Sequence, residues 1–295
     1  MGLAAALAAG VVLSSNTPAT AAETAAGRGA DHTAAVPDPT TVTYAIEPDL
    51  VTGEPVDLEL DYYLPVQPSG RALPAIIWIH GGGFRAGNRS SLESVATAYA
   101  ASGYVTLSID YRLDPESRCQ DVQDGEFSDP GEEALQRARC ETAIVTAQHD
   151  AQGAVRWLRA NAAELGVDPD RIAVGGFSAG AVTAVNVGQR ADDPGDSGEY
   201  DDVDSHVSAV LAASGCSYFP ESIDSSDAPL SLLATGHDRA IPFECVVDTA
   251  DRTEATGVTV QRIFYPDEQL HARNLYLAHQ AEADPRWLAF LGEHV

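Results

Sequence analysis

The chain has 295 residues, of which 44% are hydrophobic, enough to bury the core of one large α/β domain or two small ones. Its formal net charge at pH 7 is −27, and all 17 basic residues are arginines. Binding to nucleic acid requires a basic face, and anionic membrane surfaces repel an acidic protein, so the charge argues against both kinds of partner. The composition therefore favours a globular protein that acts on small neutral ligands.

We interpret residues 1–22 as a signal peptide. Leu3–Leu13 is an apolar run of h-region length, too short to cross a bilayer as a helix, and Ala19–Ala22 offers a small-residue cleavage pattern, although no Lys or Arg precedes the run. Residues 23–39, rich in Ala, Thr, Gly and Pro, are then a flexible leader, and residues 40–295 form the folded domain. No later stretch is apolar enough for stable membrane insertion, so we expect a secreted protein.

Four cysteines, at positions 119, 140, 216 and 245, allow three pairings in an oxidising compartment. We predict a Cys119–Cys140 disulfide, which would close a polar loop, and a Cys216–Cys245 disulfide, which would join the ends of two neighbouring strand regions. Four free thiols are the alternative. Because no C-x-x-C spacing is present, we expect no zinc site and no other metal site.

Eight stretches have the composition of strands, and most of them alternate with helical stretches. The expected strands are Thr41–Ile46, Val56–Leu64, Pro74–Ile79, Tyr104–Ile109, Arg171–Val174, His206–Ala213, Pro229–Ala234 and Val258–Tyr265. The expected helices are Ser91–Ala101, Gln148–Leu165, Ala181–Val187, Pro242–Ala255 and Ala272–Leu291. The first two strands are typical of an antiparallel hairpin. The alternation predicts a mostly parallel, eight-stranded sheet with helices on both faces.

Two stretches interrupt this alternation. Residues 112–146 are rich in Asp, Glu and Gly and carry two of the cysteines, so we interpret them as an insertion over the functional edge of the sheet. Asp192–Asp204 is dense in Asp and Gly, but its spacing does not match an EF-hand calcium loop. A solvated acidic loop is therefore preferred there over a calcium site.

One stretch, Arg171–Val182, joins a strand to a small-residue helix through a serine flanked by glycines. Gly176, Ser178 and Gly180 fit the pattern G-x-S-x-G of a nucleophile elbow. A serine on such a sharp turn projects its hydroxyl above the sheet, and glycines let the strand and the helix pass closely on either side. We predict that Ser178 is a nucleophile; a chance glycine-rich turn is the alternative.

A nucleophilic serine needs a base to take its proton and an acid to orient that base. In this architecture the acid and then the base follow the serine in chain order, each after a later strand. Asp238 follows the strand Pro229–Ala234 and is the predicted acid, with a capping or surface role as the alternative. His271 comes a few residues after the last strand, so we prefer it as the base over His279 and His294.

The negative charge that forms when a carbonyl is attacked requires hydrogen-bond donors. The backbone N–H of Ala179, next to the serine, is one predicted donor. Gly82 and Gly83, in the glycine run that follows His80, are the others, because a run of glycines leaves its amides accessible. A phosphate cradle is the alternative for this loop, but the Gly-Lys-Ser/Thr of a P-loop is missing.

Together, His80–Phe84, Gly176–Gly180, Asp238 and His271 resemble the α/β-hydrolases of the esterase and lipase kind, over about Val56–Leu291. The His-Gly-Gly-Gly loop is similar to that of the hormone-sensitive-lipase-like carboxylesterases. The elbow has the sequence Gly-Phe-Ser-Ala-Gly instead of the Gly-Asp-Ser-Ala-Gly usual in that group. A neighbouring branch, such as the acetyl-xylan or feruloyl esterases, therefore stays open.

This resemblance implies a secreted serine hydrolase that cleaves neutral carboxylic esters through an acyl-enzyme on Ser178, without a metal or an organic cofactor. The implied substrate is a small neutral ester, with an esterified sugar or polymer as one option, and the insertion at residues 112–146 would shape the acyl pocket. A serine peptidase on the same fold and a non-catalytic binding module are the alternatives. The oligomeric state stays open.

Overall fold

The computed structural model describes residues 36–66 and 70–295 of the chain. The predicted signal peptide, residues 1–22, and most of the predicted leader, residues 23–39, lie outside the described residues. The described residues belong to one compact unit. Within its described part, no helix has both the length and the hydropathy of a membrane span.

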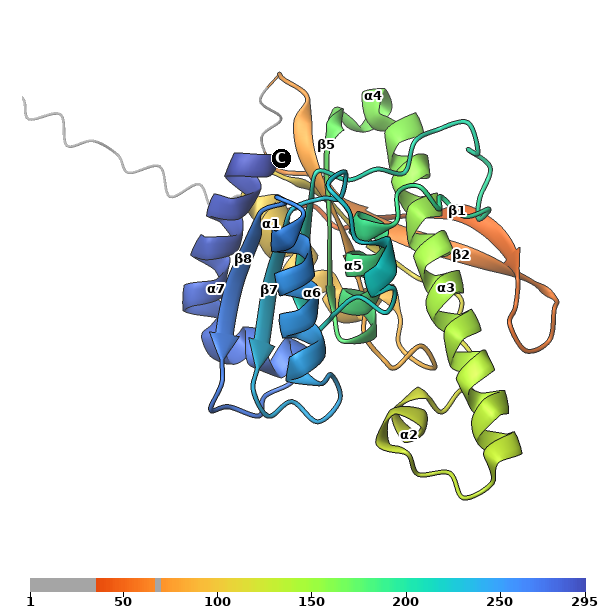
Figure 1. Cartoon of the computed structure of the whole chain (residues 1–295). Coiled ribbons are helices and arrows are strands. Elements are labelled where there is room, and N and C mark those ends of the chain that lie inside the picture. Colours follow the sequence, from red (N-terminus) through yellow and green to blue (C-terminus); the bar gives the residue numbers. More distant parts are fainter. Residues whose placement is uncertain (1–35, 67–69) are drawn as a thin grey trace, which may run out of the picture. The chain divides into compact units, whose positions relative to one another are not determined.

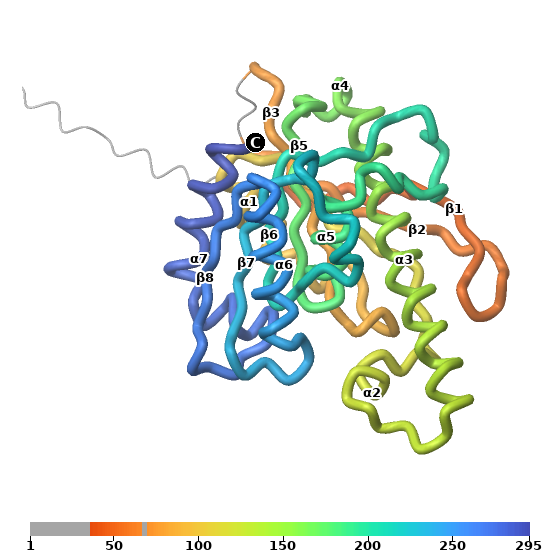
Figure 2. Tube along the Cα trace, viewed as in Figure 1, coloured from red at the N-terminus to blue at the C-terminus, as the bar shows by residue number. Residues whose placement is uncertain are grey.

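An eight-stranded sheet runs through this unit in the order β1-β2-β4-β3-β5-β6-β7-β8 (Figure 1 and Figure 2). The pairs β1–β2 and β2–β4 are antiparallel, and all other neighbouring strands are parallel. The strands are β1 (Thr40–Pro48), β2 (Pro55–Tyr63), β3 (Leu73–Ile79), β4 (Val105–Ile109), β5 (Val167–Phe177), β6 (Ala209–Ala213), β7 (Leu230–Thr235) and β8 (Val260–Tyr265). The prediction of a mostly parallel, eight-stranded sheet is confirmed.

Helices cover both faces of the sheet, as predicted. Residues of α3, α5 and α6 share one buried hydrophobic cluster with the strands, and residues of α1 and α7 share a second cluster on the opposite face. The helices are η1 (Arg89–Leu92), α1 (Glu93–Ala101), α2 (Cys119–Asp124), α3 (Pro130–Ala160), α4 (Ala162–Leu165), α5 (Ala179–Gln189), η2 (Pro220–Ser222), α6 (Phe243–Ala255) and α7 (Ala272–His294).

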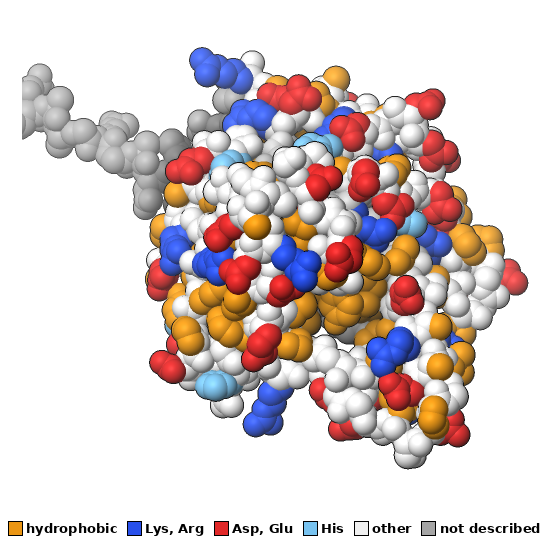
Figure 3. Space-filling model, viewed as in Figure 1, with side chains coloured by type: hydrophobic (Ala, Val, Ile, Leu, Met, Phe, Trp, Pro, Cys, Tyr) orange, Lys and Arg blue, Asp and Glu red, His pale blue; other side chains and the backbone are white. Residues whose placement is uncertain are grey.

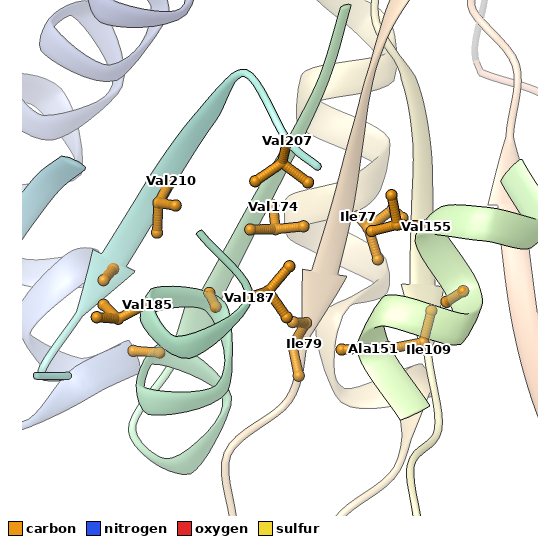
Figure 4. Packing of buried hydrophobic residues seen from close by; sticks show 14 of the residues in the cluster. Ile77, Ile79, Ile109, Ala151, Val155, Val174, Val185, Val187, Val207 and Val210 are labelled. Carbon is orange, nitrogen blue, oxygen red and sulfur yellow. The ribbon is translucent and has the colours of Figure 1, made fainter. Parts of the chain in front are cut away.

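The side chains of the central strand β3 alternate between these two clusters. Ile77 and Ile79 belong to the cluster under α3 and α5, whereas Trp78 belongs to the cluster under α1 and α7. Figure 4 shows Val155 of α3 and Val187 of α5 in the layer between these helices and the strands. Because both faces of β3 are buried, its sequence is a continuous apolar run, and the strand is a rigid support for the loop that follows Ile79.

The insertion at residues 112–146 is more regular than the sequence suggested. The prediction that a helix begins at Gln148 is wrong, because α3 begins at Pro130 and runs for 31 residues. Asp129 caps this helix by accepting hydrogen bonds from the N–H groups of Gly131 and Glu132. The first ten residues of α3 bury no side chain, and Figure 1 shows this part standing away from the sheet beside α2. It therefore lacks the apolar periodicity on which sequence-based prediction depends.

Both predicted disulfides form. Cys119–Cys140 joins the start of α2 to α3, so it closes the insertion on itself. Cys216–Cys245 joins the loop after β6 to the first turn of α6, and not to a second strand end as expected. The two bridges therefore fix the insertion and the loop after β6, which both lie at the carboxyl end of the sheet.

The buried side chain of Arg156 holds the acidic loop at residues 192–204 in place. Arg156 donates to the carbonyl oxygens of Pro194 and Ser197, and the hydroxyl of Ser197 donates to the fully buried carboxylate of Asp150. Asp150 in turn pairs with Arg112 at 2.7 Å. Within the described part of the chain, no cluster of three or more His, Cys, Asp or Glu side chains could hold a metal ion. The loop is therefore attached through its main-chain carbonyls and through the hydroxyl of Ser197, which contacts a buried ion pair.

Candidate active site

A strained turn carries Ser178 between the end of β5 and the start of α5. Ser178 has φ 56° and ψ −123°, a conformation that is costly for a residue with a side chain. A Cβ atom added to Gly176 would lie 2.1 Å from the carbonyl oxygen of Gly180, and one added to Gly180 would lie 2.1 Å from that of Ile79. No other residue type fits at these two positions, so the glycines on either side of Ser178 are required by main-chain contact.

The structure brings the predicted nucleophile, base and acid together. The Nε2 atom of His271 lies 2.8 Å from the Oγ atom of Ser178. The Nδ1 atom of His271 lies 2.8 Å and 3.0 Å from the two carboxylate oxygens of Asp238. The three residues follow β5, β7 and β8 in turn, so they meet at the carboxyl edge of the sheet. This geometry allows the serine to pass its proton to the imidazole while the carboxylate holds the opposite ring N–H.

The surroundings of Asp238 keep its carboxyl group ionised. Its side chain is 3% exposed, and this burial raises its pKa. Hydrogen bonds from His271, from the hydroxyl of Ser214 and from the N–H of Ala240 outweigh burial and hold the pKa of Asp238 below its ordinary value. A buried anion next to the ring can therefore stabilise an imidazolium at His271, whose side chain is 33% exposed and open to a ligand.

The alternative histidines have other contacts. The Nε2 atom of His279 lies 2.9 Å from a carboxylate oxygen of Glu268, and its ring stacks on Tyr265. The ring of His294 packs against Phe290 near the end of α7. Neither is hydrogen-bonded to Ser178.

The glycine loop after β3 runs directly against the elbow. A Cβ atom added to Gly81 would lie 3.1 Å from the Cβ atom of Ser178. Within the described residues, the amides of Gly82 and Gly83 donate to no main-chain carbonyl, and Ala179 is the first residue of α5, where helical amides lack partners. These three N–H groups are therefore available to an anion formed next to Ser178.

The ring of His80 contacts Tyr111 and Gly81, and no hydrogen bond joins it to Ser178. The ring of His80 stacks on that of Tyr111, and the hydroxyl of Tyr111 donates to the carbonyl oxygen of His80 at 2.9 Å. Burial lowers the pKa of His80, so its ring is neutral at pH 7. Its Nδ1 atom lies 2.7 Å from the carbonyl oxygen of Gly81, which fixes the direction in which the loop leaves β3.

Three residues next to the site were not found from the sequence. Ser214, directly after β6, is among the groups that lower the pKa of Asp238, and its Oγ atom accepts a hydrogen bond from the N–H of Ala272 at 2.9 Å. Gln120 and Gln123 of α2 donate to the carbonyl oxygens of Arg239 and Ala240 at 3.2 Å and 3.0 Å, so the insertion holds the loop that carries the acid. None of the three residues lies in a motif. The one sequence feature that could have indicated Ser214 is its position directly after a central strand.

A serine on a strained strand-to-helix turn, bonded to a histidine and an aspartate from later strands of a mostly parallel sheet, defines the α/β-hydrolase fold. The fold is similar to that of Thermogutta terrifontis esterase 2 phosphonylated by sarin, with a TM-score of 0.69 and 19% identity, covering 88% of this chain and 97% of that chain. The BD-FAE family model matches residues 60–124 and 136–251, which is more than half of the chain. The chain belongs to the BD-FAE family.

Two relatives that are named as esterases share part of their length with this chain. Carboxylesterase NlhH of Mycobacterium tuberculosis is 35% identical over 124 residues, 42% of this chain and 31% of that protein. Chlorogenic acid esterase of Aspergillus niger is 30% identical over 174 residues, 58% of this chain and 28% of that protein. The chain thus spans about a third of the length of the curated relatives it matches. The family match includes Ser178 and Asp238 and ends before His271.

Proposed function

We propose that this protein is a serine hydrolase that cleaves neutral carboxylic esters through an acyl-enzyme on Ser178. The observation that carries the proposal is the continuous line of hydrogen bonds from Ser178 through His271 to Asp238, next to accessible main-chain amides. The esterase names of the relatives support an ester as the substrate. The net charge of −27 supports a neutral one, because an acidic protein repels anions.

Each residue then has one task in the reaction. The oxygen of Ser178 attacks the ester carbonyl carbon while Nε2 of His271 takes the hydroxyl proton. The oxyanion accepts hydrogen bonds from the amides of Gly82, Gly83 and Ala179, each worth about a hundredfold in rate. The imidazolium gives its proton to the departing alcohol and leaves an acyl-serine, which a water activated by the same nitrogen hydrolyses. The carboxylate of Asp238 stabilises the imidazolium in both steps.

We also propose that an apolar cavity beside the insertion receives the acyl chain. The cavity has a volume of about 360 Å³, and its lining includes Val122 and Gln123 of α2, Ile144 of α3, and Tyr218 and Phe219 after β6. Figure 3 shows hydrophobic side chains gathered in a hollow beside the lobe that carries α2. The amide of Gln123 also hydrogen-bonds to the acid loop, so one wall of the cavity adjoins the site.

Export to an oxidising compartment is the third part of the proposal. Two disulfides account for all four cysteines, and such bonds persist outside the reducing cytosol. The signal peptide inferred for residues 1–22 provides the route.

The esterase proposal is tested with a series of p-nitrophenyl esters of rising chain length, beside a proline anilide and the Ser178→Ala variant. We expect ester cleavage to exceed amide cleavage and to fall by at least about 10⁴-fold in Ser178→Ala, because the nucleophile is lost. Faster cleavage of the anilide than of every ester would establish the peptidase alternative. No cleavage, with Ser178 unlabelled by a fluorophosphonate, would establish a binding module.

The proposal that the acyl chain binds in the cavity is tested with a variant that fills the cavity. Val122→Trp places a large ring among the lining residues, so we expect kcat/KM for p-nitrophenyl octanoate to fall about tenfold or more while that for the acetate stays within about twofold. Leu135→Trp is the matched control, because Leu135 is 58% exposed on α3 and does not line the cavity. A parallel loss on both esters in Val122→Trp would show that the cavity does not hold the acyl chain.

Export is tested on protein collected from the culture medium of an expressing host. We expect the secreted chain to begin near residue 23 and its unreduced mass to be lower than the sequence mass by four hydrogens, because two disulfides form. Retention of the whole chain inside the cell, with four alkylatable thiols, is the result that would rule out export.

A further inference from the structure

The Cys119–Cys140 disulfide lies in the wall of the cavity that we assign to the acyl chain. Both half-cystines line this cavity, next to Val122 and Gln123 of α2. The other disulfide, Cys216–Cys245, is not part of the lining. The catalytic steps give neither bond a task. The position of the first bond therefore raises the question of what it does for the cavity.

The lobe that carries α2 has no core of its own. The structure describes all of residues 118–139, and none of them is buried. α2 has six residues, about half the length at which an isolated helix becomes marginally stable in water. Neither hydrophobic cluster of the described residues includes a residue of α2, which lies away from the strands in Figure 1. Hydrophobic burial therefore contributes little to keeping α2 beside the cavity.

The polar contacts around the start of α2 are weak because they are exposed. Arg118 pairs with Asp121 and Glu132, but its side chain is 40% exposed, and such ion pairs contribute little to stability. The N–H of Arg118 also donates to the side-chain oxygen of Gln136 at 2.9 Å. Cys140, in contrast, is 6% exposed and is the first buried residue of α3. The disulfide is therefore the strongest link between α2 and the buried part of the protein.

The acid is held by contacts that do not involve α2. The carboxylate of Asp238 accepts hydrogen bonds from the N–H groups of Ala240 and Ile241 at 2.8 Å and 3.2 Å, inside its own loop. It also contacts the ring of His271 at 2.8 Å. The hydrogen bond from Gln123 to the carbonyl oxygen of Ala240 is exposed, so water can replace it. Cleavage of a short ester, whose acyl group does not fill the cavity, therefore does not depend on α2.

We propose that the Cys119–Cys140 disulfide determines the acyl-chain specificity of the enzyme by holding α2 as one wall of the acyl cavity. This inference rests on the proposed function and deepens it. With the bond formed, α2 gives a long acyl chain a surface to pack against. With the bond broken, α2 leaves this position and the cavity loses a wall. Long esters then lose binding energy in the transition state, while short esters keep theirs.

The test compares two double variants on p-nitrophenyl octanoate and acetate. In Cys119→Ala/Cys140→Ala we expect kcat/KM for the octanoate to fall about tenfold or more and that for the acetate to stay within about twofold. Cys216→Ala/Cys245→Ala is the matched control. That bond joins residues 29 positions apart, against 21 for the first bond, but its two ends pack in or against a hydrophobic cluster. We expect the control to keep the wild-type ratio of the two values, although its Tm falls.

The same bond can also be broken and remade in one protein. Because the chain has four cysteines, the Cys216→Ala/Cys245→Ala variant retains Cys119–Cys140 alone. One thiolate of dithiothreitol attacks a sulfur of this bond, and the second thiol closes the reagent into its cyclic disulfide, which leaves two thiols on the protein. We expect cleavage of the octanoate to fall on reduction and to recover on reoxidation, which separates the effect from a failure to fold.

Two results would overturn the proposal. An unchanged ratio of octanoate to acetate cleavage in Cys119→Ala/Cys140→Ala, with Val122→Trp still selective against the octanoate, would show that α2 keeps its place without the bond. A parallel loss on both esters would show that the bond supports the whole site and not the cavity. Failure of the proposed function is separate: the wild type would then cleave no ester, or Val122→Trp would not act selectively, and the inference would fall with it.

Discussion

The geometry of the candidate site depends on the close main-chain contacts of Gly176 and Gly180, the two glycines that flank Ser178. Gly180 lies so close to the end of β3, and Gly176 so close to Gly180, that neither position has room for a Cβ atom. This contact fixes the height of the turn above the sheet and brings the first amide of α5 next to the glycine loop. It also imposes the positive φ of Ser178, whose cost is met by the rigid, doubly buried strands on either side.

Features that local sequence determines were predictable. The elbow and the glycine loop each follow a buried apolar strand, and main-chain contacts permit few residue types there. That Asp238 and His271 lie next to Ser178 was predictable because parallel strands bring their carboxyl ends to one edge, so that chain order limits the candidates. The central strands were found because their burial shows as continuous apolar runs, and β2 was found from the alternation of apolar and polar residues. The first ten residues of α3 were not found, because they bury no side chain; the Asp129-Pro130 cap was their one signal.

Contacts between distant segments were not predictable. Ser214 meets Ala272 across 58 positions, and Gln123 meets Ala240 across 117 positions. The sequence around a serine that follows a strand, or around a glutamine on a short helix, carries no signal that the residue contacts a distant loop. These contacts fix the start of α7 through Ser214 and the loop that carries Asp238 through α2. The insertion thus lines the cavity that we propose for the acyl chain and also contacts the loop that carries Asp238.

The central claim is that Ser178 becomes covalently acylated when His271 removes its proton. The most direct measurement is acid quenching of the protein within milliseconds of mixing with a p-nitrophenyl ester, followed by peptide mass mapping. We expect the acyl mass on the peptide that contains Ser178 in the wild type, and none in His271→Ala on the same time scale. Turnover of the ester at an undiminished rate with no acyl group on Ser178 would contradict the claim.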